Sequence, residues 1–153
     1  MTRNPSLPRP PDAIRKHMTP RPVTIAANRT LAEAHALMRE RRIRHLPVVA
    51  GDSLVGILSL RDLHLLETLR DVDPSMVTVD EAMTPNPFAV VPEAPLQSVV
   101  DTMARNKWGS AIVVKKGRVV GLFTATDGMR LLAKLLPHAG RPAPKARPAR
   151  RPS

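Results

Sequence analysis

Met18-Thr19-Pro20 and, 65 residues later, Met83-Thr84-Pro85 open two copies of one sequence pattern. The same shift, without a gap, places Leu31 on Leu96, Met38 on Met103, Val48-Val49 on Val113-Val114, Val55-Gly56 on Val120-Gly121 and Asp62 on Asp127. Self-similarity at a fixed period indicates a repeat architecture. We therefore expect two related units that pack with pseudo-twofold symmetry and leave a cleft between them.

Each copy has the pattern of a β-α-β-β-α unit, so the predicted fold class is α/β (α+β). Thr30 and Glu33 have the form of a capping box that opens the first helix, and prolines before residue 23 favour extended backbone there. Apolar runs that flank a Gly-containing turn predict a hairpin. The expected elements are strands at 23–25, 46–49 and 54–58 with helices from 30 and 59, then strands at 88–91, 112–114 and 119–123 with helices at 96–105 and 126–136.

The composition limits the kind of protein. The chain has 153 residues, of which 42% are hydrophobic and 2% aromatic, so its core must be built from aliphatic side chains and Met. It contains no Cys, which excludes a disulfide framework and a thiolate metal site. No stretch reaches the roughly 18–20 apolar residues of a membrane-spanning helix, and the N-terminal residues do not resemble a signal peptide. We expect a cytoplasmic protein without a membrane partner.

The net charge of +11 is concentrated at the two ends of the chain. Residues 17–136 carry only +3, whereas residues 1–16 carry +3 and residues 137–153 carry +5. Proline-rich, charged ends with few apolar residues do not offset the entropy cost of ordering. The predicted organisation is a disordered basic N-terminus (1–16), a first repeat (17–70), a linker (71–80), a second repeat (81–136) and a disordered basic tail (137–153). The tail could bind nucleic acid weakly, but a solubilising role is the simpler interpretation.

A Gly-x-x-Ser/Thr-x-x-Asp pattern ends the hairpin in each copy. It reads Gly56 to Asp62 in the first copy and Gly121 to Asp127 in the second. A hydroxyl, free backbone N–H groups and the positive end of a helix dipole suit a phosphate, and a nearby carboxylate accepts hydrogen bonds from ribose hydroxyls. The same pattern is also a generic helix capping box. Taken alone it favours capping, and its recurrence does not decide the matter because a duplicated fold repeats its caps.

The ordered set of motifs, present twice, resembles a tandem pair of cystathionine-β-synthase (CBS) domains, also called a Bateman module. The resemblance covers about residues 16–136. It implies a homodimer and an adenosine-containing ligand (AMP, ADP, ATP or S-adenosylmethionine) between the repeats. It also implies ligand contacts from the residues that match the family motif: Ser59, Arg61, Asp62, Thr124, Thr126 and Asp127.

Basic residues precede the first buried strand. In nucleotide-sensing members of the family that the chain resembles, residues at the positions of Arg44 and His45 reach phosphates. Arg also grips phosphate in a bidentate manner. The second copy has Gly109 and Ser110 at these positions, so we expect two clefts of unequal charge, with Ser110 as the smaller counterpart. The preceding Arg41 and Arg42 are interpreted as a solvated helix end, where cations complement the dipole.

These observations predict a regulatory module that binds an adenosine-containing ligand and acts on a separate protein that the sequence does not identify. We expect no enzyme activity, no required cofactor and no metal site, because the sequence has no P-loop, Gly-x-Ser-x-Gly, Cys nucleophile or His-Glu-x-x-His pattern. Two alternatives stay open. One is a structural or interaction module with an empty cleft, and the other is a nucleic-acid-associated protein that acts through its basic tails.

Overall fold

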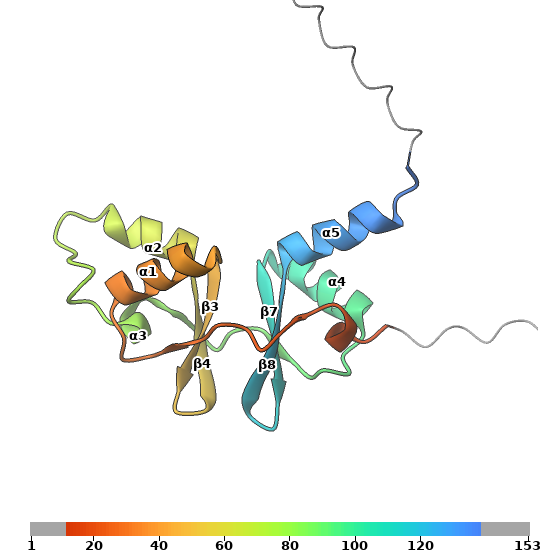
Figure 1. Ribbon diagram of the computed structural model, residues 1–153, viewed down its shortest axis with the longest axis horizontal. Helices are drawn as coiled ribbons and strands as arrows, with labels where there is room; N and C mark the ends of the chain where they lie inside the picture. The colour runs from red at the N-terminus through yellow and green to blue at the C-terminus, as the bar shows by residue number, and fades with distance from the viewer. Residues whose placement is uncertain (1–11, 139–153) are drawn as a thin grey trace, which may run out of the picture.

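The computed structural model describes residues 12–138 (Figure 1). Two repeats lie side by side, each with a long hairpin at the centre and helices toward the outside. The two units that the sequence predicts are confirmed as β2-α1-β3-β4-α2 and β6-α4-β7-β8-α5. The elements are η1 (Ile14–Lys16), β1 (Thr19–Pro20), β2 (Ile25–Ala26), α1 (Leu31–Arg41), β3 (His45–Ala50), β4 (Ser53–Ser59), α2 (Leu60–Glu67), α3 (Val79–Ala82), β5 (Thr84–Pro85), β6 (Ala89–Val90), α4 (Leu96–Asn106), β7 (Ser110–Lys115), β8 (Arg118–Thr124) and α5 (Ala125–Leu135).

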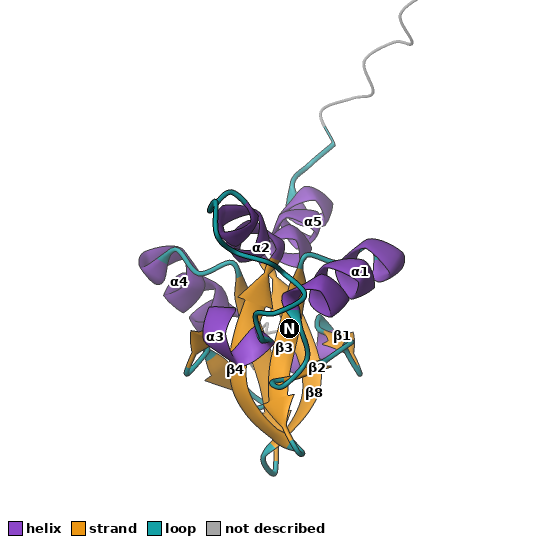
Figure 2. Ribbon diagram, turned by 90° about the vertical axis from the view of Figure 1, so that its left-hand side faces the viewer, coloured by secondary structure: helices purple, strands orange, loops and turns teal. Residues whose placement is uncertain are grey.

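Local sequence signals explain the hairpins and the helix starts. The turn between β7 and β8 has positive φ at Lys116 (50°) and Gly117 (77°), as tight hairpin turns require. The predicted capping box is present at α1, where the Thr30 hydroxyl accepts from the Glu33 N–H and the Glu33 carboxylate accepts from the Thr30 N–H. Strands β4 and β8 contact each other, so the two hairpins form the centre of the molecule (Figure 2).

Two short strands are exchanged between the repeats, which the sequence analysis did not predict. Strand β1 of the first repeat pairs antiparallel with β8 of the second, and β5 of the second repeat pairs antiparallel with β4 of the first. The resulting sheets have the orders β1-β8-β7-β6 and β2-β3-β4-β5. Neither four-stranded sheet is therefore complete without a strand from the other repeat.

Gly56 lies opposite Pro85 where β4 pairs with the exchanged strand β5, and the close contact there leaves no room for a side chain. A Cβ at this position would lie 2.8 Å from the Met83 Cγ and 2.9 Å from the Thr84 carbonyl oxygen. We expect Gly56→Ala to lower the free energy of unfolding by about 1–3 kcal/mol, because overpacking displaces the exchanged strand. Denaturant unfolding measures the change. Gly128→Ala is the control, since its Cβ would be 3.8 Å from Phe123 and Ala is favoured over Gly in a helix. If Gly56→Ala lowers the free energy of unfolding no more than Gly128→Ala does, β5 does not pack as closely on Gly56 as the structure indicates.

The first repeat begins earlier than the sequence analysis placed it. Residues 1–16 were expected to be disordered, but residues 12–16 are part of the fold, and that boundary is corrected. Ile14 is fully buried in the second repeat's core, and its N–H donates to the Ala94 carbonyl (2.8 Å). Val79, the residue 65 positions later, is also fully buried and donates to Arg29 (2.7 Å). Each copy therefore begins with a helical turn that packs against the other repeat.

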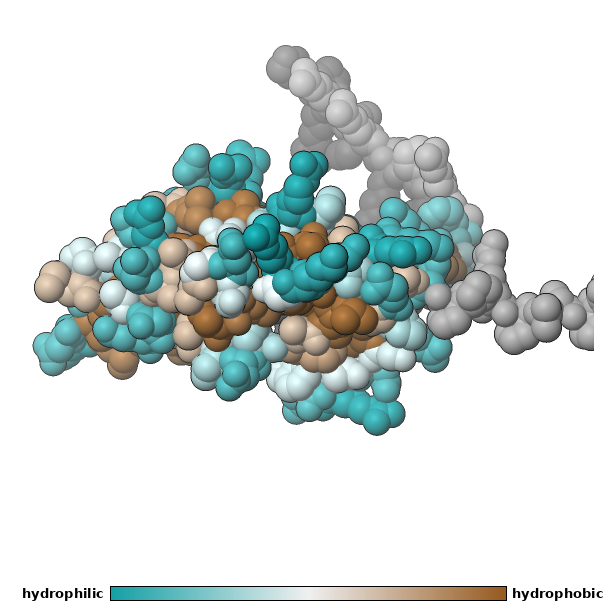
Figure 3. All heavy atoms as spheres, turned by 90° about the horizontal axis from the view of Figure 1, so that it is seen from below, coloured by the Kyte–Doolittle hydropathy of each residue, from teal (hydrophilic) through white to brown (hydrophobic). Residues whose placement is uncertain are grey.

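Residues 1–11 and 139–153, predicted to be disordered, lie outside the described residues. The predicted linker (71–80) packs on the first repeat, whose core includes Val79. Within residues 12–138, no helix has the length and apolar character needed to cross a bilayer. Seen from below, the surface carries hydrophobic patches between hydrophilic side chains (Figure 3).

Candidate functional site

A cavity of about 570 Å³, here called the inter-repeat cavity, brings together segments far apart in the sequence. One wall comes from the chain after β1 and from the connection between α1 and β3, and the other comes from the start of α5. The lining residues are Thr19, Arg21, Pro22, Val23, Arg42, Ile43, Arg44, His45, Gly109, Leu122, Thr124, Ala125, Thr126, Asp127 and Arg130. Five predicted site residues thus meet here: Arg44 and His45 from the first repeat, and Thr124, Thr126 and Asp127 from the second.

A complete capping box fixes the Asp127 carboxylate at the floor of this cavity. The Thr124 N–H and hydroxyl both donate to Asp127 Oδ2, at 2.9 and 3.0 Å, and the Thr124 hydroxyl accepts from the Asp127 N–H at 3.3 Å. The other oxygen, Oδ1, lies 3.7 Å from Arg130 Nη1. The capping interpretation of this motif is therefore confirmed. The box also leaves Oδ1 in position to accept hydrogen bonds from a ligand.

The cavity is rich in positive charge. Four arginines (Arg21, Arg42, Arg44 and Arg130) line it with one carboxylate, Asp127. Arginine presents a planar fork of donors that matches phosphate oxygens. Converging like charges repel one another unless an anion balances them. The electrostatics of the cavity thus favour an anionic ligand.

Two of these arginines have a backbone conformation that other residues adopt more readily. Arg21 (φ 46°) and Arg42 (φ 54°) are in the left-handed region, as are their counterparts 65 positions later, Asn86 (φ 50°) and Lys107 (φ 57°). The fold therefore requires this conformation in both repeats. Gly and Asn adopt it at least cost. The first repeat has Arg at both positions, and both side chains line the cavity.

His45 lies near the centre of the pseudo-twofold arrangement. Its Nε2 would be 3.4 Å from a Cβ built on Gly109 of the other repeat. Burial lowers the pKa of His45 below its ordinary value of 6.5, and the Arg44 charge acts in the same direction, whereas the Asp62 and Asp127 charges oppose the shift. His45 is thus held near a carboxylate from each repeat in a setting that favours the neutral imidazole.

The pKa of His45 makes the folded state sensitive to acid. Because the pKa is lower in the folded than in the unfolded state, the unfolded chain takes up the proton first as the pH falls, and stability is lost below about pH 6.5. We expect the free energy of unfolding to fall more steeply with decreasing pH for the wild type than for His45→Gln. Denaturant unfolding at a series of pH values measures both slopes. If the free energy of unfolding changes with pH equally in the wild type and in His45→Gln, folding does not lower the pKa of His45.

The first repeat also forms a cavity of its own. A second cavity of about 500 Å³ is lined by Arg44, His45, Ser59, Leu60, Arg61, His64, Leu65 and Thr68. The predicted residues Ser59 and Arg61 therefore lie apart from those at the start of α5. Asp62 and Ser110 line neither cavity: Asp62 closes the capping box with Ser59, and Ser110 pairs with Thr124 across β7 and β8.

Several lining residues were not predicted from the sequence. Thr19 and Arg21 reach the cavity only because β1 is exchanged onto β8. Arg42 was interpreted as a solvated helix end, but it lines the cavity. Arg130 lies one turn after Asp127 on α5, and this spacing was the one local signal that could have identified it.

The CBS domain family model matches residues 13–65 and 79–134, which include both walls of the cavity. The chain belongs to the CBS domain family. Its two CBS repeats are 37% identical over 106 residues to part of an inosine-5′-monophosphate dehydrogenase from Korarchaeum cryptofilum. The match covers 69% of this chain and 21% of that enzyme, so the chain spans about a fifth of the dehydrogenase's length.

Two similar solved structures contain CBS domains with bound ligands. The CBS domain pair of protein MJ0100, in complex with 5′-methylthioadenosine and S-adenosyl-L-methionine, is 26% identical with a TM-score of 0.71, covering 82% of this chain and 98% of that one. The CBS domain of a bacterial CNNM/CorC family Mg²⁺ transporter, in complex with ATP, is 31% identical with a TM-score of 0.69, covering 79% and 87%. The fold of this chain is thus that of a CBS pair.

Proposed function

We propose that this CBS pair is a regulatory module that binds a phosphate-bearing adenine nucleotide in the inter-repeat cavity. The observation that carries the proposal is the convergence of four arginines on a cavity whose single carboxylate is Asp127. In this arrangement Asp127 accepts hydrogen bonds from the ribose hydroxyls, and Arg44 with its neighbours binds the phosphates. His45 lines the same cavity, and its neutral imidazole carries one N–H that can donate to a phosphate oxygen.

The charge of the cavity selects among the adenosine ligands that the family resemblance implies. The related structures contain ATP in one case and S-adenosyl-L-methionine with 5′-methylthioadenosine in another. S-adenosylmethionine carries a cationic sulfonium group, which four arginines disfavour through like-charge repulsion. ATP, ADP and AMP carry phosphates that arginine forks bind well. We therefore favour the nucleotides over S-adenosylmethionine.

A thermal-shift panel tests this proposal. A ligand present at about 100 times its dissociation constant stabilises the folded chain by ~2.7 kcal/mol. We expect shifts with ATP, ADP and AMP that exceed those with adenosine and S-adenosylmethionine at equal concentration. No shift with any adenosine compound would reject nucleotide binding. A larger shift with S-adenosylmethionine than with ATP would reject the role given to the arginines.

Regulation is proposed to operate through a dimer and a separate target protein. A ligand shifts an equilibrium between two arrangements only by its difference in affinity for them.

An apolar groove of about 810 Å³ between α4 and α5 supports a dimer contact. Its side chains include Met129, Leu132 and Leu135, which are 65%, 46% and 81% exposed. Exposed apolar patches of this kind mark interaction surfaces.

We expect the charged substitution Leu132→Glu to dissociate the dimer, because it places a carboxylate in the apolar contact. Sedimentation equilibrium of the wild type and the variant measures the molecular mass. The exposed substitution Arg105→Glu on α4 is the control and should leave the mass unchanged. A wild type that is monomeric at all concentrations, or a dimer that survives Leu132→Glu, would contradict this contact.

A further inference from the structure

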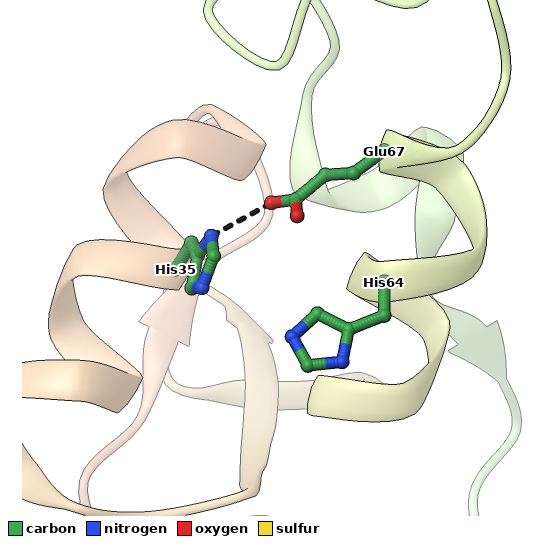
Figure 4. Close-up of side chains that lie close together, drawn as sticks. All are labelled: His35, His64 and Glu67. Atoms are coloured by element: carbon green, nitrogen blue, oxygen red, sulfur yellow. Dashed lines mark ion pairs between the residues drawn. The ribbon is translucent and has the colours of Figure 1, made fainter.

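Two helices of the first repeat bring together three side chains that the proposed nucleotide site does not use. His35 lies on α1, and His64 and Glu67 lie on α2 (Figure 4). His35 Nδ1 is 2.7 Å from Glu67 Oε1, and the His35 and His64 rings meet edge to face with centroids 5.9 Å apart. One donor atom from each residue lies within 4.8 Å of the other two. We propose that these residues bind a divalent transition-metal ion such as Zn²⁺.

The donor set fits this class of ion. Two imidazole nitrogens and one carboxylate oxygen occur together as Zn²⁺ ligands at sites that keep a further position open. Imidazole ligands favour Zn²⁺ and its transition-metal neighbours, whereas Mg²⁺ and Ca²⁺ take oxygen ligands. The three side chains therefore select against the hard cations.

Metal binding requires the three donor atoms to move closer together. In tetrahedral coordination, two atoms that are each about 2.1 Å from Zn²⁺ lie about 3.4 Å apart. A donor pair separated by up to 4.8 Å must therefore approach by as much as about 1.4 Å. His64 is exposed, so space on its solvent side allows its side chain to adopt another rotamer. His64 and Glu67 are three residues apart on one helix, which places them on the same face. The side chains of His35 and Glu67 are 28% and 30% exposed, so an ion reaches them from solvent.

The second repeat shows that the fold itself does not require polar residues at these positions. The residues 65 positions after His35, His64 and Glu67 are Val100, Met129 and Leu132. These three line the apolar groove between α4 and α5. The same pair of helices thus presents apolar side chains in one repeat and two histidines with a glutamate in the other. An inter-helix ion pair alone would need His35 and Glu67 but not His64.

Titration of the full chain with Zn²⁺ against a chromogenic zinc indicator tests the site. We expect saturable binding to the wild type. At a Zn²⁺ concentration about 100 times the dissociation constant, the ratio of folded to unfolded chain should rise about 100-fold. His64→Ala and Glu67→Gln should each weaken binding by more than the roughly 10–100-fold that loss of an outer-shell partner costs. Mg²⁺ should not displace the bound Zn²⁺.

His17→Ala is the matched control, because His17 pairs with Asp12 (2.9 Å) away from this cluster. It should retain wild-type Zn²⁺ affinity. Unchanged melting temperatures of the metal-free variants establish that each one folds. Absence of saturable Zn²⁺ binding would overturn the proposal, as would equal affinity in His64→Ala and the wild type or loss of binding in His17→Ala. In those cases the cluster is an ion pair between helices.

Discussion

Asp127→Ala should reduce the affinity for ATP by about 100-fold. The carboxylate accepts hydrogen bonds from the ribose hydroxyls in the proposed complex, and bonds to a charged group contribute about 1.5–3 kcal/mol each. Losing two of them corresponds to at least two factors of ten in the dissociation constant. Isothermal titration calorimetry of the wild type and the variant measures this difference directly.

The first repeat supplies the matched control for this prediction. Asp62 closes the same kind of capping box as Asp127, with the Ser59 N–H donating to Asp62 Oδ2 at 3.1 Å, but it does not line the inter-repeat cavity. Asp62→Ala should cost a similar ~1 kcal/mol of stability through the lost cap and leave ATP affinity close to that of the wild type. If the two variants lose affinity equally, the assignment of the nucleotide to the Asp127 side is wrong.

Ile14→Ala should lower the free energy of unfolding by about 2–5 kcal/mol, the range for truncation of a fully buried aliphatic side chain. The side chain is 0% exposed and packs in the cluster that contains Val99, Met103 and Phe123. Residues near a chain end are often poorly ordered and tolerate changes of their side chain, so a large effect at position 14 is informative. Urea unfolding monitored by circular dichroism gives the change.

Arg15→Ala is the control for Ile14, since Arg15 is exposed and its hydrogen bond to the Pro92 carbonyl comes from the backbone (3.1 Å). Exposed substitutions usually change stability by no more than about 0.5 kcal/mol. Equal effects at the two positions would show that residues 12–16 are not part of the folded core.

The features that the sequence predicted correctly are those set by local interactions. The hairpins, the Thr30–Glu33 cap and the Ser/Thr-x-x-Asp caps depend on residues within a few positions of one another, and all are present. The 65-residue period predicted that the two units pack against each other. Arg44 and His45 line the same cavity as Asp127, while the expectation of two clefts of unequal charge stays a prediction.

The features that the sequence did not predict depend on the other repeat or on another helix. Strands β1 and β5 have two residues each, one of them proline. Such short strands carry almost no periodicity, so their exchange between the repeats had no local signal. Ile14 is buried because its side chain packs in the core of the second repeat. His35 lies 29 and 32 residues before His64 and Glu67, and sequence spacing alone does not show that α1 and α2 bring them together.

A crystal structure of the chain with ATP would show directly where the nucleotide binds. We expect one nucleotide in the inter-repeat cavity, with the ribose hydroxyls donating to Asp127 and a phosphate oxygen within hydrogen-bonding distance of Arg44. A nucleotide bound in the second cavity beside Ser59 and Arg61, or a structure at saturating ATP in which the arginines contact no phosphate, would contradict it.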